Sequence, residues 1–257
     1  MNPSFLVWTV ALCCQPRSAP VYSAASVVHS ATNRQVLAPN TFGTIYGKGL
    51  SWSTRAIGPA DLLAGFLPPY LLGTGVTVFV DGFAAPVFYV SPDQINFLVP
   101  NTALPEREAK LRVNLDGISG PEVNVRLKAV APGLFLRDME TVAAVKLDGR
   151  LLSDKNLATG GEDVVLFATG LGPLIPEPAY MEVARSAAPL ARRAEFQLLL
   201  NGTPVEDKRI RYVGAAPGFA GLYQINLWLP EGVTSWPEVR IGVAGELSPV
   251  GVRLPVK

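Results

Sequence analysis

The sequence contains the same series of segments twice, in the same order. Residues 45–50 (IYGKGL) recur as residues 166–171 (LFATGL), and residues 94–100 (QINFLVP) recur as residues 224–230 (QINLWLP). The offset between the copies is about 120 to 130 residues. A period of this length indicates tandem domains, because solenoids are built from much shorter repeats. The chain is therefore expected to contain two copies of one folding unit.

Each copy is dominated by alternating apolar and polar residues, which is typical of β-strands. Residues 76–80 (VTVFV) alternate and are followed by Asp81-Gly82 and a second apolar segment. Asp-Gly between such segments predicts a type I′ hairpin turn, which needs positive φ at both central residues. Similar dipeptides occur at three further places: Asp116-Gly117, Asp148-Gly149 and Asn201-Gly202. The pattern predicts an all-β protein made of two tandem immunoglobulin-like β-sandwich domains.

The chain length and the positions of Pro and Gly suggest where the domains begin and end. The 257 residues suit two domains of ordinary size. Pro132-Gly133 interrupts the strand pattern, so we expect the first domain at 26–129 and the second at 130–257. Segments 59–66 and 177–188 are locally compatible with helix and occupy equivalent places in the two copies. We expect both to be long loops at corresponding ends of the sandwiches.

Residues 1–25 are expected to be an export segment. Residues 5–14 form an apolar run of ten, which is too short for a transmembrane helix of about 20 residues but suits a secretory signal. Small residues at 18–20 (SAP) and 24–26 (AAS) offer cleavage positions, although no Lys or Arg precedes the run. A lipidated cysteine at position 13 or 14, a buried strand and a miscalled start are the alternatives.

Four longer phrases carry a resemblance to a known family. They are 84–97 (AAPVFYVSPDQINF), 131–135 (APGLF), 168–173 (ATGLGP) and 216–226 (APGFAGLYQIN). In these phrases the chain resembles the tandem Ig-like C-terminal modules of secreted acidobacterial proteins, which are related to the IPT/TIG class of Ig-like domains. The resemblance covers about residues 26–257. It implies an extracellular pair of β-sandwiches and no catalytic residues.

The composition argues against several functional classes. A formal net charge of +1 gives no strong positive potential that would attract a polyanion, so we expect no nucleic-acid partner. A single histidine, His29, and two adjacent cysteines supply neither a metal-ligand set nor a histidine-dependent triad. We therefore expect no metal, no cofactor and no enzymatic activity, and no transmembrane helix.

Trp52 and Tyr180 are the candidate binding residues. Each falls in the long loop that follows a repeated Gly-Leu pair, after Leu50 for Trp52 and after Leu171 for Tyr180. Loops at the ends of Ig-type sandwiches often recognise partners, and a Trp or Tyr ring offers a rigid apolar surface. The alternative is that each ring covers the core of its own domain.

The repeated amide residues are expected to serve the fold, by alternating outward from the sheet or by capping a turn. A ligand contact is the alternative. These residues are Gln94, Asn96, Gln224 and Asn226. The apolar residues between them should point into the two cores: Ile95, Phe97, Ile225 and Leu227.

Together these features predict a non-catalytic structural or adhesion module, secreted or at the bacterial cell surface. Its end loops would contact a protein or a surface polysaccharide. The alternative is a carbohydrate-binding module associated with secreted polysaccharide degradation. Aromatic side chains in line on one sheet face would favour the alternative, whereas a featureless polar face would favour a spacer.

Overall fold

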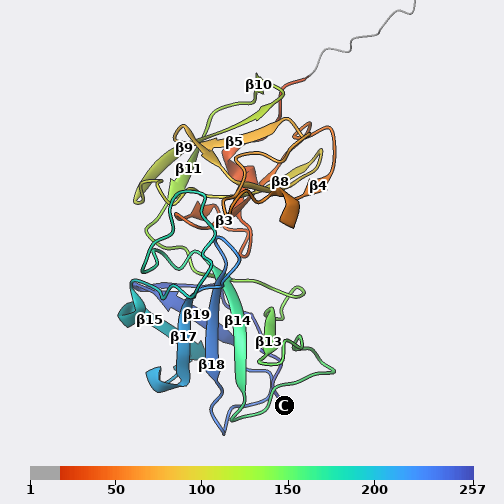
Figure 1. Ribbon diagram of the computed structural model, residues 1–257. Coiled ribbons are helices and arrows are strands. Elements are labelled where there is room, and N and C mark those ends of the chain that lie inside the picture. Colours follow the sequence, from red (N-terminus) through yellow and green to blue (C-terminus); the bar gives the residue numbers. More distant parts are fainter. Residues whose placement is uncertain (1–17) are drawn as a thin grey trace, which may run out of the picture.

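The computed structural model describes residues 18–257 and shows an all-β chain. Most of the predicted export segment, residues 1–17, lies outside the described residues. Two β-sandwiches are stacked end to end, the first built from β1–β11 and the second from β12–β20 (Figure 1). The helices of the described part are short 3-10 turns: η1 Ala24–Ser26, η2 Pro59–Asp61, η3 Arg193–Glu195 and η4 Asp207–Arg209.

The first sandwich consists of a five-stranded and a six-stranded sheet. The five-stranded sheet has the order β1 (Val27–His29), β3 (Phe42–Tyr46), β8 (Gln94–Leu98), β7 (Val87–Val90) and β4 (Arg55–Ala56). The other has the order β2 (Val36–Leu37), β11 (Val123–Leu127), β9 (Arg107–Leu115), β5 (Val76–Val80) and β6 (Phe83–Ala85), with β10 (Ile118–Ser119) paired to β9. Only β2 and β11 pair in parallel among these strands.

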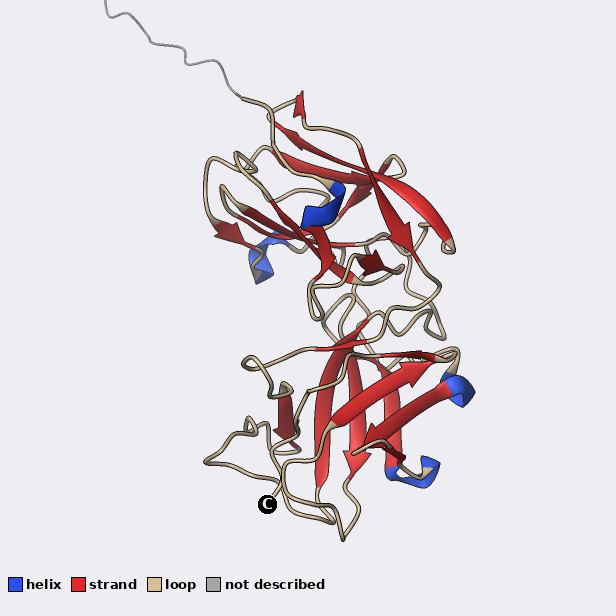
Figure 2. Ribbon diagram, turned by 180° about the vertical axis from the view of Figure 1, so that it is seen from behind, coloured by secondary structure: helices blue, strands red, loops and turns tan. Residues whose placement is uncertain are grey.

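The second sandwich repeats this plan with fewer strands. One sheet has the order β12 (Gly133–Leu134), β14 (Asp163–Thr169), β18 (Tyr223–Trp228) and β17 (Ile210–Ala215), and β13 (Ala144–Lys146) pairs with β14. The other has the order β16 (Thr203–Pro204), β15 (Phe196–Leu200), β19 (Val239–Val243) and β20 (Glu246–Leu247). Seen from behind, loops of both sandwiches meet at the junction (Figure 2).

The alternation of the sequence places the core between the sheets. In β5, for example, Val76, Val78 and Val80 are buried, whereas the residues between them are partly exposed. One core cluster is formed by residues between Tyr22 and Leu127, and another by residues between Val130 and Val256. We propose the domain boundary in the short interval between these clusters.

The register confirms that the two repeats build the same arrangement of strands. Ile95 of β8 lies between Ile45 of β3 and Val90 of β7. Ile225 of β18 lies in the same way between Leu166 of β14 and Val213 of β17. In both sheets a register shift precedes the repeated tyrosine, Tyr89 or Tyr212. The expected core residues Ile95, Phe97, Ile225 and Leu227 are fully buried, as predicted.

Three of the four predicted hairpin turns have positive φ at both central residues, as a type I′ turn requires. These are Asp81-Gly82, Asp116-Gly117 and Asn201-Gly202. The prediction is wrong at Asp148-Gly149, where only Gly149 has positive φ and its N–H bonds to the carbonyl oxygen of Lys146.

The helix-compatible segments form no α-helix. The only helical turn in segment 59–66 is η2, and segment 177–188 contains no helix. The two loops instead pair with each other across the junction. The N–H of Leu67 donates to the carbonyl oxygen of Met181 at 2.8 Å, and the N–H of Val183 donates to that of Gly65 at 2.9 Å. Main-chain pairing between loops thus replaces the hydrogen bonds that a helix would have made within each loop.

Candidate functional site

Trp52 lies at the free end of the first sandwich. Its side chain is 52% exposed, and its indole Nε1 donates a hydrogen bond of 3.0 Å to Oδ2 of Asp116. Asp116 belongs to the turn between β9 and β10, near the beginning of β5. The ring is therefore held in place at one edge while much of its surface stays open to solvent.

Tyr180 lies at the junction between the sandwiches. Its hydroxyl donates to the carbonyl oxygen of Ala84 in β6, and its ring meets that of Phe83 edge-on, with centroids 6.3 Å apart. Partial burial raises the pKa of Tyr180. The structure therefore does not bring Trp52 and Tyr180 together: they lie at opposite ends of β5.

The two sandwiches point in the same direction along the molecule. This explains why the loop with Trp52 lies at the free end and the loop with Tyr180 lies at the junction. β3 begins at Phe42, at the junction, and ends at Tyr46, toward the free end. β14 ends at Thr169, at the junction, where Phe42 N donates to Thr169 Oγ1 at 3.2 Å. The loop after β3 thus starts near the free end, whereas the loop after β14 starts against the first sandwich (Figure 1).

A second candidate surface lies on the outer face of β3, β8 and β7. Tyr46, 45% exposed, is paired with Gln94, and Asn96 is paired with Tyr89. Gln94 Nε2 donates to Asn96 Oδ1 at 2.9 Å, and Thr44 Oγ1 lies 3.1 Å from the same oxygen. The Gln94 and Asn96 side chains therefore point outward as predicted, and these hydrogen bonds hold them in one arrangement.

This surface keeps free hydrogen-bonding groups beside aromatic rings. Within residues 18–257, no hydrogen bond is made by Asn96 Nδ2 or by Gln94 Oε1. One is a donor and the other an acceptor. Arg55 on the edge strand β4 is paired with Asp61 at 2.6 Å, which offsets its charge. The surface is therefore suited to an uncharged ligand with many hydroxyl groups.

The second sandwich has equivalent residues at the places of Tyr46, Gln94, Asn96 and Tyr89. Phe167 of β14 is paired with Gln224, and Asn226 is paired with Tyr212 of β17. Gln224 Nε2 donates to Asn226 Oδ1 at 3.2 Å. All four side chains are partly exposed. The sequence alone does not indicate this surface, because the aromatic partners come from other strands.

His29 is a structural residue of the junction. Its ring is 1% exposed and lies with Nε2 2.9 Å from the carbonyl oxygen of Ala131, while Nδ1 accepts from Ala31 N at 3.1 Å. These contacts fit a neutral ring that carries its proton on Nε2. Burial lowers the pKa of His29 to about 4.

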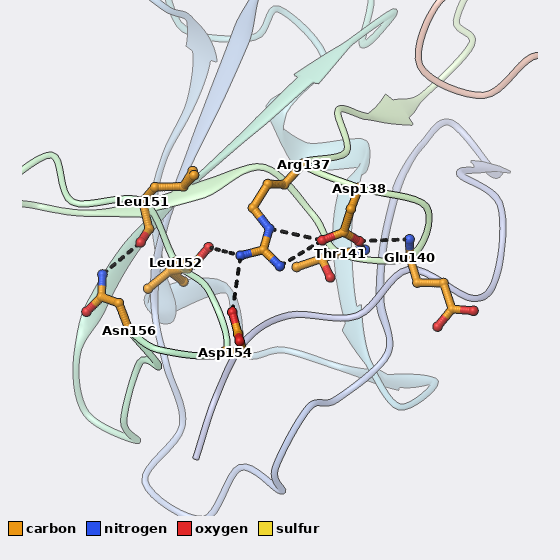
Figure 3. A network of polar contacts seen from close by, with 8 residues as sticks. All are labelled: Arg137, Asp138, Glu140, Thr141, Leu151, Leu152, Asp154 and Asn156. Carbon is orange, nitrogen blue, oxygen red and sulfur yellow. Dashed lines mark hydrogen bonds and ion pairs between the residues drawn. The ribbon is translucent and has the colours of Figure 1, made fainter.

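A polar network in the second sandwich is also structural (Figure 3). The Arg137 guanidinium donates to Asp138 Oδ2 at 2.7 and 3.0 Å and to the carbonyl oxygen of Leu152 at 3.4 Å. Asp138 Oδ1 accepts from the N–H groups of Glu140 and Thr141. These hydrogen bonds hold the pKa of Asp138 well below its usual range. Arg137 and Asp138 point toward each other and Arg137 reaches Leu152, so the network joins two loops, whereas the Glu140 side chain points away from it (Figure 3).

Residues 18–257 contain neither a metal-ligand cluster nor a candidate membrane-spanning helix. No group of three or more His, Cys, Asp or Glu side chains is placed to hold a metal ion. No helix in this part of the chain is long and apolar enough to cross a membrane.

Comparisons with known proteins give weak similarities. No protein-family model and no curated protein matches the sequence. Among solved structures, the chain is similar to the surface glycan-binding protein PbSGBP-B from Prevotella bryantii (9% identity, TM-score 0.29, covering 93% of this chain and 42% of that one). It is also similar to SGBP-B of the Bacteroides ovatus mixed-linkage glucan utilization locus, in complex with a mixed-linkage heptasaccharide (11%, 0.32, 87% and 43%). The tandem Ig repeats of Dlar match with 11% identity, a TM-score of 0.23 and coverages of 93% and 95%.

These values define neither a family nor a ligand for the chain. It spans less than half the length of the first two structures. The likeness to acidobacterial modules therefore depends on the sequence phrases alone.

Proposed function

We propose that the protein is a non-catalytic, extracytoplasmic module that binds a neutral polysaccharide on the outer face of β3, β8 and β7. The supporting observation is the cross-strand register that puts Tyr46 beside Gln94 and Tyr89 beside Asn96. This is the carbohydrate-binding alternative from the sequence. It also agrees with an adhesive role, since a module that binds a surface polysaccharide adheres to that surface.

The chemistry of this face matches that of a sugar. A pyranose ring presents hydroxyl groups at its rim and apolar C–H groups on its faces. The free donor of Asn96 and the free acceptor of Gln94 can bond to hydroxyls, and the rings of Tyr46 and Tyr89 provide flat apolar contacts. No ionised side chain belongs to the set, which favours a neutral polymer over an acidic one.

Trp52 supports a second candidate, the recognition of a partner by the end loops. Its exposed ring at the free end of the molecule has the properties of an interface anchor. Tyr180 is not available in the same way, since its hydroxyl and ring contact the first sandwich. We therefore propose Trp52 alone as the anchor of an end-loop site.

Affinity electrophoresis of residues 18–257 tests the proposal. The gels contain mixed-linkage β-glucan, xyloglucan or galactomannan, with polygalacturonate as an acidic comparison. We expect at least one neutral polymer to retard the native chain, and the double variant Gln94→Ala/Asn96→Ala to bind roughly 10- to 100-fold more weakly, since two hydrogen bonds are lost.

Asn124→Ala is the matched control, because Asn124 is exposed on β11 of the opposite sheet. It should bind as the native chain does, and all variants should keep the native melting temperature. Binding that is unchanged in the double variant, or that is confined to polygalacturonate, would contradict the proposal.

A further inference from the structure

We infer that the second sandwich carries a second binding position for the same polysaccharide chain, formed by Phe167, Gln224, Asn226 and Tyr212. One polymer would then be held along both sandwiches. This inference rests on the proposed function and extends it: the ligand is a chain long enough to reach two positions, and a short oligosaccharide occupies each position separately.

The two positions have a similar construction, although in the second the Tyr212 hydroxyl donates to main-chain carbonyl oxygens of Ala188 and Ala215. In each, an amide pair is joined by a hydrogen bond from Gln to Asn, at 2.9 Å in the first sandwich and 3.2 Å in the second. In each, an aromatic residue lies beside the Gln and a Tyr beside the Asn. Gln224 Oε1 and Asn226 Nδ2 make no hydrogen bond within residues 18–257, as in the first position.

The two positions lie on counterpart strands that follow one another along the molecule (Figure 1). β3 and β14 run in the same direction, and the beginning of β3 is bonded to the end of β14 through Phe42 and Thr169. The residues of the two positions therefore occur in the same order along the molecule. A linear polysaccharide has a direction, so one chain can meet both positions in the same orientation.

The distance between the positions sets the length of the ligand. At a rise of about 3.3 Å per residue, Tyr46 and Phe167 are roughly 25 Å apart along the two strands and the bond between them. A trisaccharide is too short to reach both, whereas a polymer is not. The loop 216–222 lies between the positions, and a Cβ on its Gly221 would meet Leu98 at 2.2 Å, so this loop is packed closely on the first sandwich.

Several polar contacts hold the junction between the sandwiches. Asn40 Nδ2 donates to Glu177 Oε1 at 2.7 Å, and Asn101 Nδ2 donates to the carbonyl oxygen of Pro178 at 2.9 Å. Lys128 and Glu246 form an ion pair of 2.6 Å. Because these contacts limit movement between the sandwiches, binding at one position places the polymer near the other. Such an arrangement raises the affinity for a polymer without any new type of contact.

Trp228 does not belong to the second position, although it follows Asn226 closely on the same strand. The guanidinium groups of Arg209 and Arg211 lie over its ring, 4.4 and 5.0 Å from the centroid. Its indole Nε1 donates to the carbonyl oxygen of Gly161 at 3.0 Å. Its ring and its donor therefore both have partners within the protein.

Calorimetric titration of residues 18–257 tests the inference, with cellotriose and mannotriose as short probes and the retained polymer as the long one. We expect two trisaccharides per native chain and one per chain of Gln224→Ala/Asn226→Ala. We also expect this variant to bind the polymer at least 10-fold more weakly than the native chain. Gln197→Ala is the matched control, because Gln197 is a partly exposed residue of β15 on the opposite sheet. It should keep the native number of bound trisaccharides and the native affinity for the polymer.

Phe167→Leu provides a second variant, which removes the ring but keeps an apolar side chain. It should weaken polymer binding while circular dichroism shows a native fold. One trisaccharide per native chain, with unchanged polymer binding by both second-position variants, overturns the inference and leaves the proposed function standing. No binding of any neutral polymer by the native chain overturns both.

Discussion

The backbone N–H of Phe42 donates to Oγ1 of Thr169, joining the first residue of β3 to the last residue of its counterpart β14. Thr169 is fully buried, and its hydroxyl also lies 2.9 Å from the carbonyl oxygen of Gly221. One side chain thus bonds to the main chain of the first sandwich and to a loop of the second. The orientation of the two sandwiches depends on such bonds and not on a flexible linker.

Thr169→Val should therefore weaken the junction. Valine has nearly the same shape but leaves the Phe42 N–H and the Gly221 carbonyl oxygen without this partner. We expect a loss of about 1–3 kcal/mol in the free energy of unfolding, measured by urea denaturation. Thr203→Val on the exposed strand β16 is the control and should change little. Equal stability of the two variants would contradict the role given to Thr169.

His29 should make stability depend on pH in weakly acidic solution. Its pKa is lowered from 6.5 to about 4 in the folded chain, because burial disfavours the charged ring. Between these two values the unfolded chain binds a proton that the folded chain does not, so stability rises with pH in this window and levels off above it. We expect a loss of roughly 3 kcal/mol on going from pH 7 to pH 4.

The comparison with His29→Gln isolates this effect. Several carboxyl groups also titrate in acid, but they are present in both chains. The native chain should lose more stability than the variant between pH 7 and pH 4, as measured by denaturation at each pH. Parallel pH profiles for the two chains would show that His29 does not carry the effect.

The sequence was sufficient to predict the fold because its signals are local. Asp81-Gly82 and the alternation of β5 define a hairpin without reference to distant residues. Tyr180 could not be placed in this way. Its contact with Ala84 depends on which end of one sandwich faces the other, and neither loop at the junction has a periodic pattern. The aromatic partners of the amides were missed because strand pairing, not sequence spacing, puts Tyr46 beside Gln94.

Tyr22 should be needed for a stable first sandwich. It is buried in the core cluster, and its hydroxyl accepts from the N–H of Val113 and donates to the carbonyl oxygen of Pro121. Cleavage at 24–26 would remove it, whereas cleavage at 18–20 would leave it in place. A chain beginning at Ser26 should melt well below one beginning at Ser18, because a large buried side chain is worth about 3–5 kcal/mol. Equal melting temperatures would show that Tyr22 adds little.

The two repeated isoleucines should contribute to stability in the same way. Ile95 and Ile225 are fully buried at equivalent positions of β8 and β18. Replacing either by Ala should cost about 2–5 kcal/mol, since the transfer free energy is lost and a cavity is left. Val250→Ala, at a residue that is 66% exposed, is the control for denaturant unfolding. A cost below about 1 kcal/mol at both isoleucines would contradict their place in the core.

Trp52 and Tyr180 should respond differently to replacement by alanine. Trp52 is half exposed and makes one side-chain hydrogen bond, to Asp116, so Trp52→Ala should leave the melting temperature nearly unchanged. Tyr180→Ala removes a hydrogen bond and a ring contact at the junction, so it should lower stability by about 1–3 kcal/mol. Retention on a cell wall, a polysaccharide or a partner protein provides the second measurement. Loss of retention in Trp52→Ala, with a native melting temperature, would support an end-loop site at the free end. Unfolding of Trp52→Ala would show instead that the ring covers the core, because an exposed binding residue can be removed without loss of the fold.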